Sequence, residues 1–172
     1  SGMSCPLPVP ARDGSILQQL AGRPAAVFSF LDGTWSRYPN REKCAALGRT
    51  LASLHLKAAP VTRLRENALG PAGWRPLLDS IGDDADILRA GMGETIRTRL
   101  DSILVDWPEA LPRGVIHADL FPNNVLFIGD ELTVVIDFYF ACNDILAYDL
   151  GICLNSWCFE ADGSFNPTKS RA

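Results

Sequence analysis

The sequence predicts an α+β fold that is mainly helical, with short β hairpins. Two observations support this prediction. Apolar residues recur at intervals of three and four in several long segments, as in amphipathic helices, whereas three short β-like runs lie between residues 114 and 136. The 172 residues, of which 47% are hydrophobic, are sufficient for one packed core.

The first thirty residues predict extended structure. Prolines alternate along Cys5–Pro10 and remove backbone donors, so this stretch is expected to form an edge segment or a connection. The short apolar run that follows Pro24 predicts a strand near 25–30.

Two helices are predicted in the middle of the chain. Asn40 is a favourable N-cap, and apolar residues follow it at helical spacing, which predicts a helix near 41–57. Several Pro and Gly residues between 60 and 73 interrupt the next stretch. One apolar face then predicts a helix near 93–106, which Pro108 ends.

The last third begins with strands and ends with a helix. The predicted strands are 114–116, 125–128 and 132–136, and residues 129–131 join the last two as a hairpin. Asp144 is expected to cap a final helix over 145–159, whose apolar residues share one face.

The charge and the cysteines narrow the classes of partner. A formal net charge of -4 argues against a nucleic-acid-binding role and favours a small substrate. The sequence contains no apolar run long enough to span a bilayer and no leader pattern, so we expect no membrane association. The five cysteines lack disulfide or zinc spacing, which is typical of a cytoplasmic protein.

A four-residue motif carries the predicted chemistry. His117, Asp119 and Asn124 follow one strand and Asp137 ends another, which reproduces H-x-D-L-x-x-x-N followed by D-F. In kinases this pattern supplies a base, Asp119 here, and two metal ligands, Asn124 and Asp137 here. Carboxylate and amide oxygens suit Mg²⁺, which neutralises charge on the transferred phosphate. Tyr139 replaces the usual Gly.

Two residues of the motif region allow more than one interpretation. His117 is interpreted as a scaffold of the loop, while a metal-hydrolase alternative would recruit it with Asp119 and Asp137 as ligands. Asp149 either faces solvent or braces the loop by accepting its N–H groups. His55 lies on an apolar helix face and is assigned no function.

The sequence resembles the aminoglycoside phosphotransferase superfamily, which has a protein-kinase-like fold, and more closely the homoserine kinases within it. The resemblance is carried by the loop motif and by longer phrases, namely Cys5–Pro10, Gly22–Ala25, Gly114–Pro122, Ile136–Asp144 and Cys153–Phe159. It implies phosphorylation of the L-homoserine hydroxyl with ATP and Mg²⁺. It also implies an adenine-binding hinge at Ser29, Phe30 and Leu31, and it favours the bracing role for Asp149.

The resemblance also implies a partial chain. Residues 1–31 would be a remnant of the small-lobe sheet with the hinge, and 32–172 a large catalytic lobe truncated at its C-terminal end, because no Gly-rich loop or strand Lys precedes Ser29. Such a segment is expected to be inactive alone and to self-associate through exposed apolar surface. The alternatives are a non-catalytic ATP- or metabolite-binding domain and a kinase for another small alcohol or aminoglycoside.

The substrate's ammonium and carboxylate need polar partners near the strand that ends at the proposed metal ligand Asp137, here called the metal strand. The candidates on the loops that follow it are Tyr139, Asn143, Asp144 and Glu160.

Overall fold

The computed structural model describes residues 4–108 and 110–172. Its helices and strands are, in chain order, β1 (Gln18–Leu20), β2 (Arg23–Ala25), α1 (Arg41–Ala58), α2 (Pro71–Ile81), η1 (Gly82–Asp84), α3 (Ala85–Leu88), α4 (Met92–Val105), β3 (Arg113–Ile116), η2 (Pro122–Asn124), β4 (Val125–Ile128), β5 (Glu131–Val135), η3 (Phe138–Phe140), β6 (Cys142–Ile145), α5 (Leu146–Trp157) and α6 (Pro167–Ser170).

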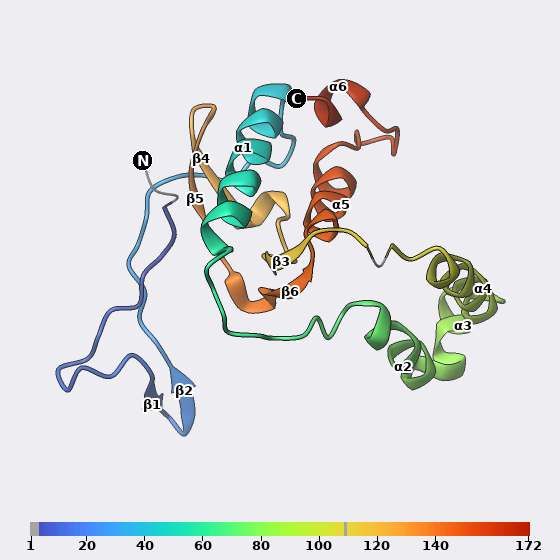
Figure 1. Cartoon of the computed structure of the whole chain (residues 1–172), viewed down its shortest axis with the longest axis horizontal. Coiled ribbons are helices and arrows are strands. Elements are labelled where there is room, and N and C mark those ends of the chain that lie inside the picture. The colour runs from blue at the N-terminus through green and yellow to red at the C-terminus, as the bar shows by residue number, and fades with distance from the viewer. Residues whose placement is uncertain (1–3, 109) are drawn as a thin grey trace.

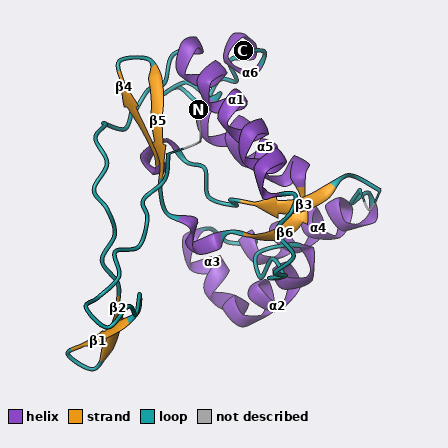
Figure 2. Cartoon of the chain, turned by 60° about the vertical axis from the view of Figure 1, so that its left-hand side comes forward, coloured by secondary structure: helices purple, strands orange, loops and turns teal. Residues whose placement is uncertain are grey.

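The strands form three antiparallel pairs, of which β3–β6 and β4–β5 lie among the helices, whereas β1–β2 lies at the end of extended segments away from them (Figure 1). The main core lies between α1, the β4–β5 hairpin and α5, and it includes Leu47, Leu51, Phe127 and Trp157. Helices α2, α3 and α4 form a group of their own, apart from α1 and α5 in both views (Figure 2). None of the helices within residues 4–108 and 110–172 combines the length and the hydropathy that a bilayer-spanning segment requires.

The predicted strand near 25–30 is wrong. β2 ends at Ala25, and residues 27–29 make only an isolated antiparallel contact with the proline-rich edge segment, centred on Pro8 and Phe28. Alternating prolines leave few donors there, so the contact consists of bonds from Val9 N to Val27 O and from Ser29 N to Leu7 O. The expected edge character of Cys5–Pro10 is confirmed.

Both predicted central helices are present. The Asn40 side chain accepts the N–H of Lys43 at 2.9 Å and caps α1, which matches 41–57, and α4 matches 93–106. The interruption expected before α4 is only partly correct, because α2 begins at Pro71. Proline suits the first turn of a helix, where its missing N–H would have no helical partner.

The last third matches the predicted strands but corrects the role of Asp144. Residues 142–145 form β6, antiparallel to β3, and the final helix begins at Leu146. Asp144 therefore lies on a strand and does not cap α5. Its buried carboxylate accepts bonds from Arg113 at 3.0 Å and from Asn67 at 2.8 Å, which anchor the α1–α2 connection to the sheet.

Candidate active site

The loop 117–124 leaves β3 in a strained conformation. Ala118 has φ = 64°, in the left-handed region that costs a non-glycine residue about 1–2 kcal/mol. Asp149 of α5 is fully buried beneath the turn, where its carboxylate accepts the N–H of His117 at 2.8 Å and that of Ala118 at 2.7 Å. These bonds satisfy one buried and one partly buried donor and hold the strained turn, so the bracing contacts expected of Asp149 are present.

Asp149 has a third partner that the sequence did not reveal. His55 Nε2 of α1 lies 2.9 Å from Asp149 Oδ2, which ties the longest helix to the loop. The histidine was interpreted only as a satisfied core residue. A half-buried imidazole on an apolar helix face needs a polar partner, and this requirement was the available signal.

His117 connects the loop to the strand that leads to Asp137. Its Nε2–H donates to the carbonyl oxygen of Ile136 at 3.0 Å, and its Nδ1 accepts the N–H of Asp119 at 3.3 Å. Burial lowers the pKa of His117, because an imidazolium would lose its hydration there. The neutral Nε2–H tautomer therefore fits both hydrogen bonds, and the ring packs 4.6 Å from that of Phe138.

Asp119 and Asn124, both in the loop 117–124, are hydrogen-bonded to each other. The Asn124 amide nitrogen donates to the backbone oxygen of Asp119 at 2.8 Å and to its carboxylate Oδ2 at 2.9 Å. Asn124 is buried and Asp119 is half-buried. The Trp157 indole donates to the Leu120 carbonyl at 2.7 Å and fixes the middle of the loop. Asp119 is thus oriented but accessible.

Asp137 stands on the neighbouring strand end. It has left-handed φ and ψ of 60° and 64°, is exposed, and accepts one bond, from the N–H of Tyr139 at 3.4 Å. The Ile136 N–H donates to the Asn124 carbonyl at 3.0 Å, so the two strand ends that carry Asn124 and Asp137 are joined directly.

The donor set fits a hard divalent cation. The amide nitrogen of Asn124 is used by Asp119, which leaves its carbonyl Oδ1 as the remaining ligand atom, and Asp137 offers a carboxylate with one long hydrogen bond. One carboxylate and one amide oxygen, completed by waters and phosphates, is a coordination typical of Mg²⁺.

The metal-hydrolase alternative does not fit this geometry. Both ring nitrogens of His117 are engaged by backbone groups, so neither is available to a metal. Across residues 4–108 and 110–172, no three His, Cys, Asp or Glu side chains gather in a cluster that could hold a metal ion.

The hinge residues lie on an exposed segment that reaches the β4–β5 hairpin. Ser29 bonds to Leu7 through both its backbone and its hydroxyl, while Phe30 is 91% exposed and Leu31 is half-buried. Farther along, Thr34 exchanges two backbone bonds with Phe127 of β4. The segment is thereby connected to the β4–β5 hairpin, which begins directly after Asn124.

The four substrate candidates do not converge on one place. Asn143 and Asp144 line a cleft of about 540 Å³ together with Glu66, Asn67, Gly70, Pro71, Ala72, Trp107 and Arg113. Tyr139 is outside that cleft, 71% exposed, on the turn after Asp137. Glu160 follows the C-terminal end of α5, where Lys169 and Asn166 bind its carboxylate.

One contact near the metal strand was missed by the sequence reasoning. Arg65, on the connection between α1 and α2, donates from Nη1 to the carbonyl oxygens of Tyr139 and Ala141. Its backbone forms two hydrogen bonds with Asn143 of β6. No local pattern in the sequence links residue 65 to residue 139, because the pairing is long-range.

Comparison with known proteins identifies the family. The model of the phosphotransferase enzyme family matches residues 2–172. The chain belongs to this family. The predicted protein-kinase-like α+β fold is likewise supported by solved structures. Aminoglycoside-3'-phosphotransferase of type VIII gives a TM-score of 0.66 at 24% identity over 95% of this chain and 63% of that chain.

A second solved structure shares the fold at lower identity. The complex of amicoumacin kinase hAmiN with AMP-PNP, Ca²⁺ and Ami gives a TM-score of 0.70 at 18% identity, over 90% of this chain and 48% of that chain.

Homoserine kinases are among the most similar sequences. The one from Afipia carboxidovorans is 56% identical over 98% of this chain and 52% of its own length. Those from Rhizobium meliloti and Agrobacterium fabrum are 56% and 53% identical over 99% of this chain, and 52% and 53% of their own lengths. The chain thus spans about half the length of the relatives it matches.

Proposed function

We propose that this chain provides the catalytic loop and metal site of an ATP-dependent kinase that phosphorylates the hydroxyl of L-homoserine. The observation that carries the proposal is the set of Asp119, Asn124 and Asp137. The Asn124 amide holds the Asp119 carboxylate, and a backbone bond joins the strand ends that carry Asn124 and Asp137. The similarity to homoserine kinases, at 53–56% identity across nearly the whole chain, supports the choice of substrate.

Asn124 and Asp137 would hold Mg²⁺, and Asp119 would receive the substrate. Bound Mg²⁺ supplies positive charge that neutralises the phosphate oxygens of ATP during transfer. Asp119 is fixed by the Asn124 amide and its carboxylate remains accessible, as a base that orients a hydroxyl requires. His117 and Asp149 do not touch the reactants in this scheme and serve to position the loop.

The proposed reaction is balanced as follows. The homoserine hydroxyl oxygen forms a bond to the γ-phosphorus of ATP, while the bond from that phosphorus to the β–γ bridging oxygen breaks. The hydroxyl proton passes to the Asp119 carboxylate and then to water. The products are O-phospho-L-homoserine and ADP.

The proposal also includes an adenine-binding hinge and a cytoplasmic location. Ser29, Phe30 and Leu31 would contact adenine through their backbone, at the boundary between a small-lobe remnant and the large lobe at residue 31. A cytoplasmic setting is supported by the cysteines, because all five are free thiols and four are buried.

The test measures ADP release by the intact protein with ATP and Mg²⁺ and one alcohol at a time. L-homoserine is expected to give a kcat/KM at least tenfold above those of choline and of an aminoglycoside. Equal values for all three would reduce the assignment to a general small-alcohol kinase. Magnesium-dependent ATP binding with no ADP release in the presence of any of the three alcohols would instead favour a non-catalytic binding domain.

A further inference from the structure

Arg65 is a cation fixed beside the proposed metal strand. Its guanidinium uses the two N–H groups of Nη1 on the carbonyl oxygens of Tyr139 and Ala141, and it lies 5.8 Å from the centre of the Tyr139 ring. The backbone of Arg65 is fixed as well, because its N–H donates to the Asn143 side chain at 2.8 Å and its carbonyl accepts the Asn143 N–H at 2.7 Å.

The charge of Arg65 is not neutralised within the described residues. Arg75, Arg97 and Arg113 each form an ion pair with an aspartate, whereas no Asp or Glu pairs with Arg65. A guanidinium has five N–H donors, and Nη1 accounts for two of them. The edge formed by Nε and Nη2 therefore has no protein acceptor in residues 4–108 and 110–172. This edge matches a carboxylate in a bidentate arrangement.

The position of Arg65 suits a short substrate. Its anchor, Tyr139, is two residues after Asp137, so their Cα atoms are at most about 7 Å apart. Arg113 is the other arginine near this sheet, but it pairs with Asp144. It also lies at the far end of β3, about 10 Å along the strand from Ile116. Of these two arginines, Arg65 is the one that contacts the turn after the metal strand and has no Asp or Glu partner among the described residues.

We propose that Arg65 binds the carboxylate of the amino-acid substrate through its Nε and Nη2 edge and thereby selects amino-acid alcohols over simple alcohols. This inference rests on the proposed homoserine kinase function and names the residue that gives it specificity. The carbonyls of Tyr139 and Ala141 set the orientation of the guanidinium, so little side-chain entropy is lost when the carboxylate binds.

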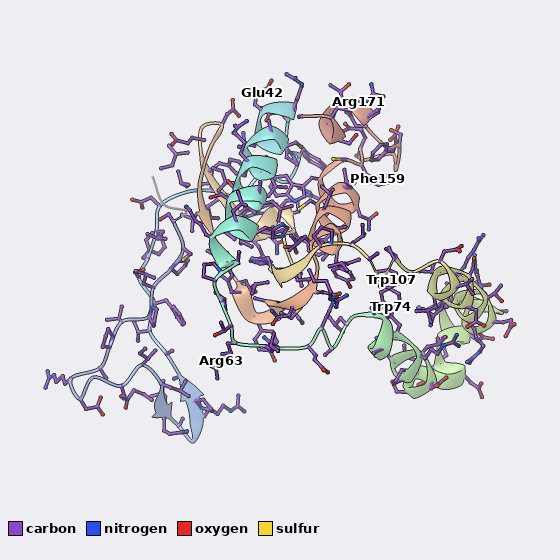
Figure 3. All side chains as sticks on the ribbon, viewed as in Figure 1. Glu42, Arg63, Trp74, Trp107, Phe159 and Arg171 are labelled. Carbon is purple, nitrogen blue, oxygen red and sulfur yellow. The ribbon has the colours of Figure 1, made fainter. Side chains whose placement is uncertain are left out.

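The experiment compares L-homoserine with 3-aminopropan-1-ol, which is the same molecule without its carboxylate. Steady-state kinetics are measured for the intact protein and for Arg65→Gln, Arg65→Lys and Arg63→Ala. Glutamine can still donate to a loop carbonyl but has no charge. Lysine keeps the charge but lacks the paired Nε and Nη2 donors, called the fork below. Arg63 is the matched control, exposed on the same connection between α1 and α2 (Figure 3).

Arg65→Gln is expected to raise the KM for homoserine about 10- to 100-fold, the loss of one charge-assisted pair, with kcat within about threefold. Its kcat/KM for 3-aminopropan-1-ol should stay within about twofold of the parent protein. Arg65→Lys should give an intermediate KM, and Arg63→Ala should match the parent with both alcohols.

Two outcomes would overturn the inference. A KM for homoserine unchanged in Arg65→Gln would show that Arg65 does not bind the carboxylate. An equal fall in kcat with both alcohols would show that Arg65 only holds the loop of Tyr139. If Arg65→Gln does not fold, Arg65→Lys decides, because an unchanged KM in a folded charge-preserving variant contradicts fork recognition. Failure of the parent protein to phosphorylate homoserine would instead refute the proposed function itself.

Discussion

The β1–β2 hairpin and the β3–β6 pair are both two-stranded antiparallel ribbons, yet their surroundings differ. All three residues of β1 are exposed, and the extended arms beside the hairpin leave Val27 and Phe30 at 67% and 91% exposure. In contrast, Ile116 at the end of β3 has no exposed surface, and α5 packs against the pair. The loop 117–124 is thus held by buried side-chain bonds from Asp149 and Trp157, whereas the hinge segment is held mainly by backbone bonds to Leu7 and to β4.

Two aspartates that accept several hydrogen bonds give the largest expected contrast. Asp149→Ala should lower the free energy of unfolding by about 3–5 kcal/mol, because it leaves one buried and one partly buried N–H group unsatisfied and the Ala118 turn unsupported. Asp13→Ala should leave the denaturation midpoint unchanged, although Asp13 accepts bonds from the Ser15 backbone and hydroxyl in an exposed turn. Urea denaturation of both variants checks this. Similar shifts would remove the distinction between the regions.

Two phenylalanines test the same contrast through packing. Phe127 of β4 is 2% exposed and packs against Trp157, so Phe127→Ala should cost about 3–4 kcal/mol of unfolding free energy. Phe30→Ala should change it by less than about 0.5 kcal/mol, because the ring is 91% exposed. A large loss for Phe30→Ala in the intact protein would mean that the hinge segment packs against another part of that protein.

His117 provides the smallest effect, a dependence of stability on pH. Its pKa is lowered in the folded protein from the ordinary 6.5, mainly by burial, so the unfolded chain binds the proton more readily. The stabilising contribution is therefore complete above about pH 6.5 and is lost as pH falls from there towards the lower folded pKa. Denaturation between pH 5.5 and 7.5 should show a shallower slope for His117→Gln than for the parent. Equal pH dependence of stability in His117→Gln and the parent would contradict the attribution of this effect to His117.

The sequence predicted those parts of the fold whose signal is local. Asn40 followed by helically spaced apolar residues predicted α1, and the D-F pattern placed Asp137 at a strand end, as observed. The motif that carries the candidate chemistry is contained within 21 residues, since 117 to 137 is one continuous stretch. This local encoding explains why these residues were found without a structure.

Most of the errors arose where long-range pairing decides the conformation. Residues 25–30 lack a neighbour with enough donors to make them a strand. Pro71 is a local exception, because proline suits the first turn of a helix and here opens α2. Asp144 was expected to cap the final helix, but it lies on β6, where it pairs with Gly114 of β3. Arg65 was missed for the same reason, because its partners are more than seventy residues away.

The proposed roles of Asp119 and its neighbours are tested most directly by one measurement. Magnesium-dependent ADP release with L-homoserine is compared between the intact protein and Asp119→Asn, with Asp106→Asn as a control from the exposed end of α4. We expect Asp119→Asn to lower kcat about 10²- to 10⁴-fold while the thermal transition is retained, and Asp106→Asn to match the parent. Homoserine-dependent turnover that is unchanged in Asp119→Asn would contradict the proposed catalytic site.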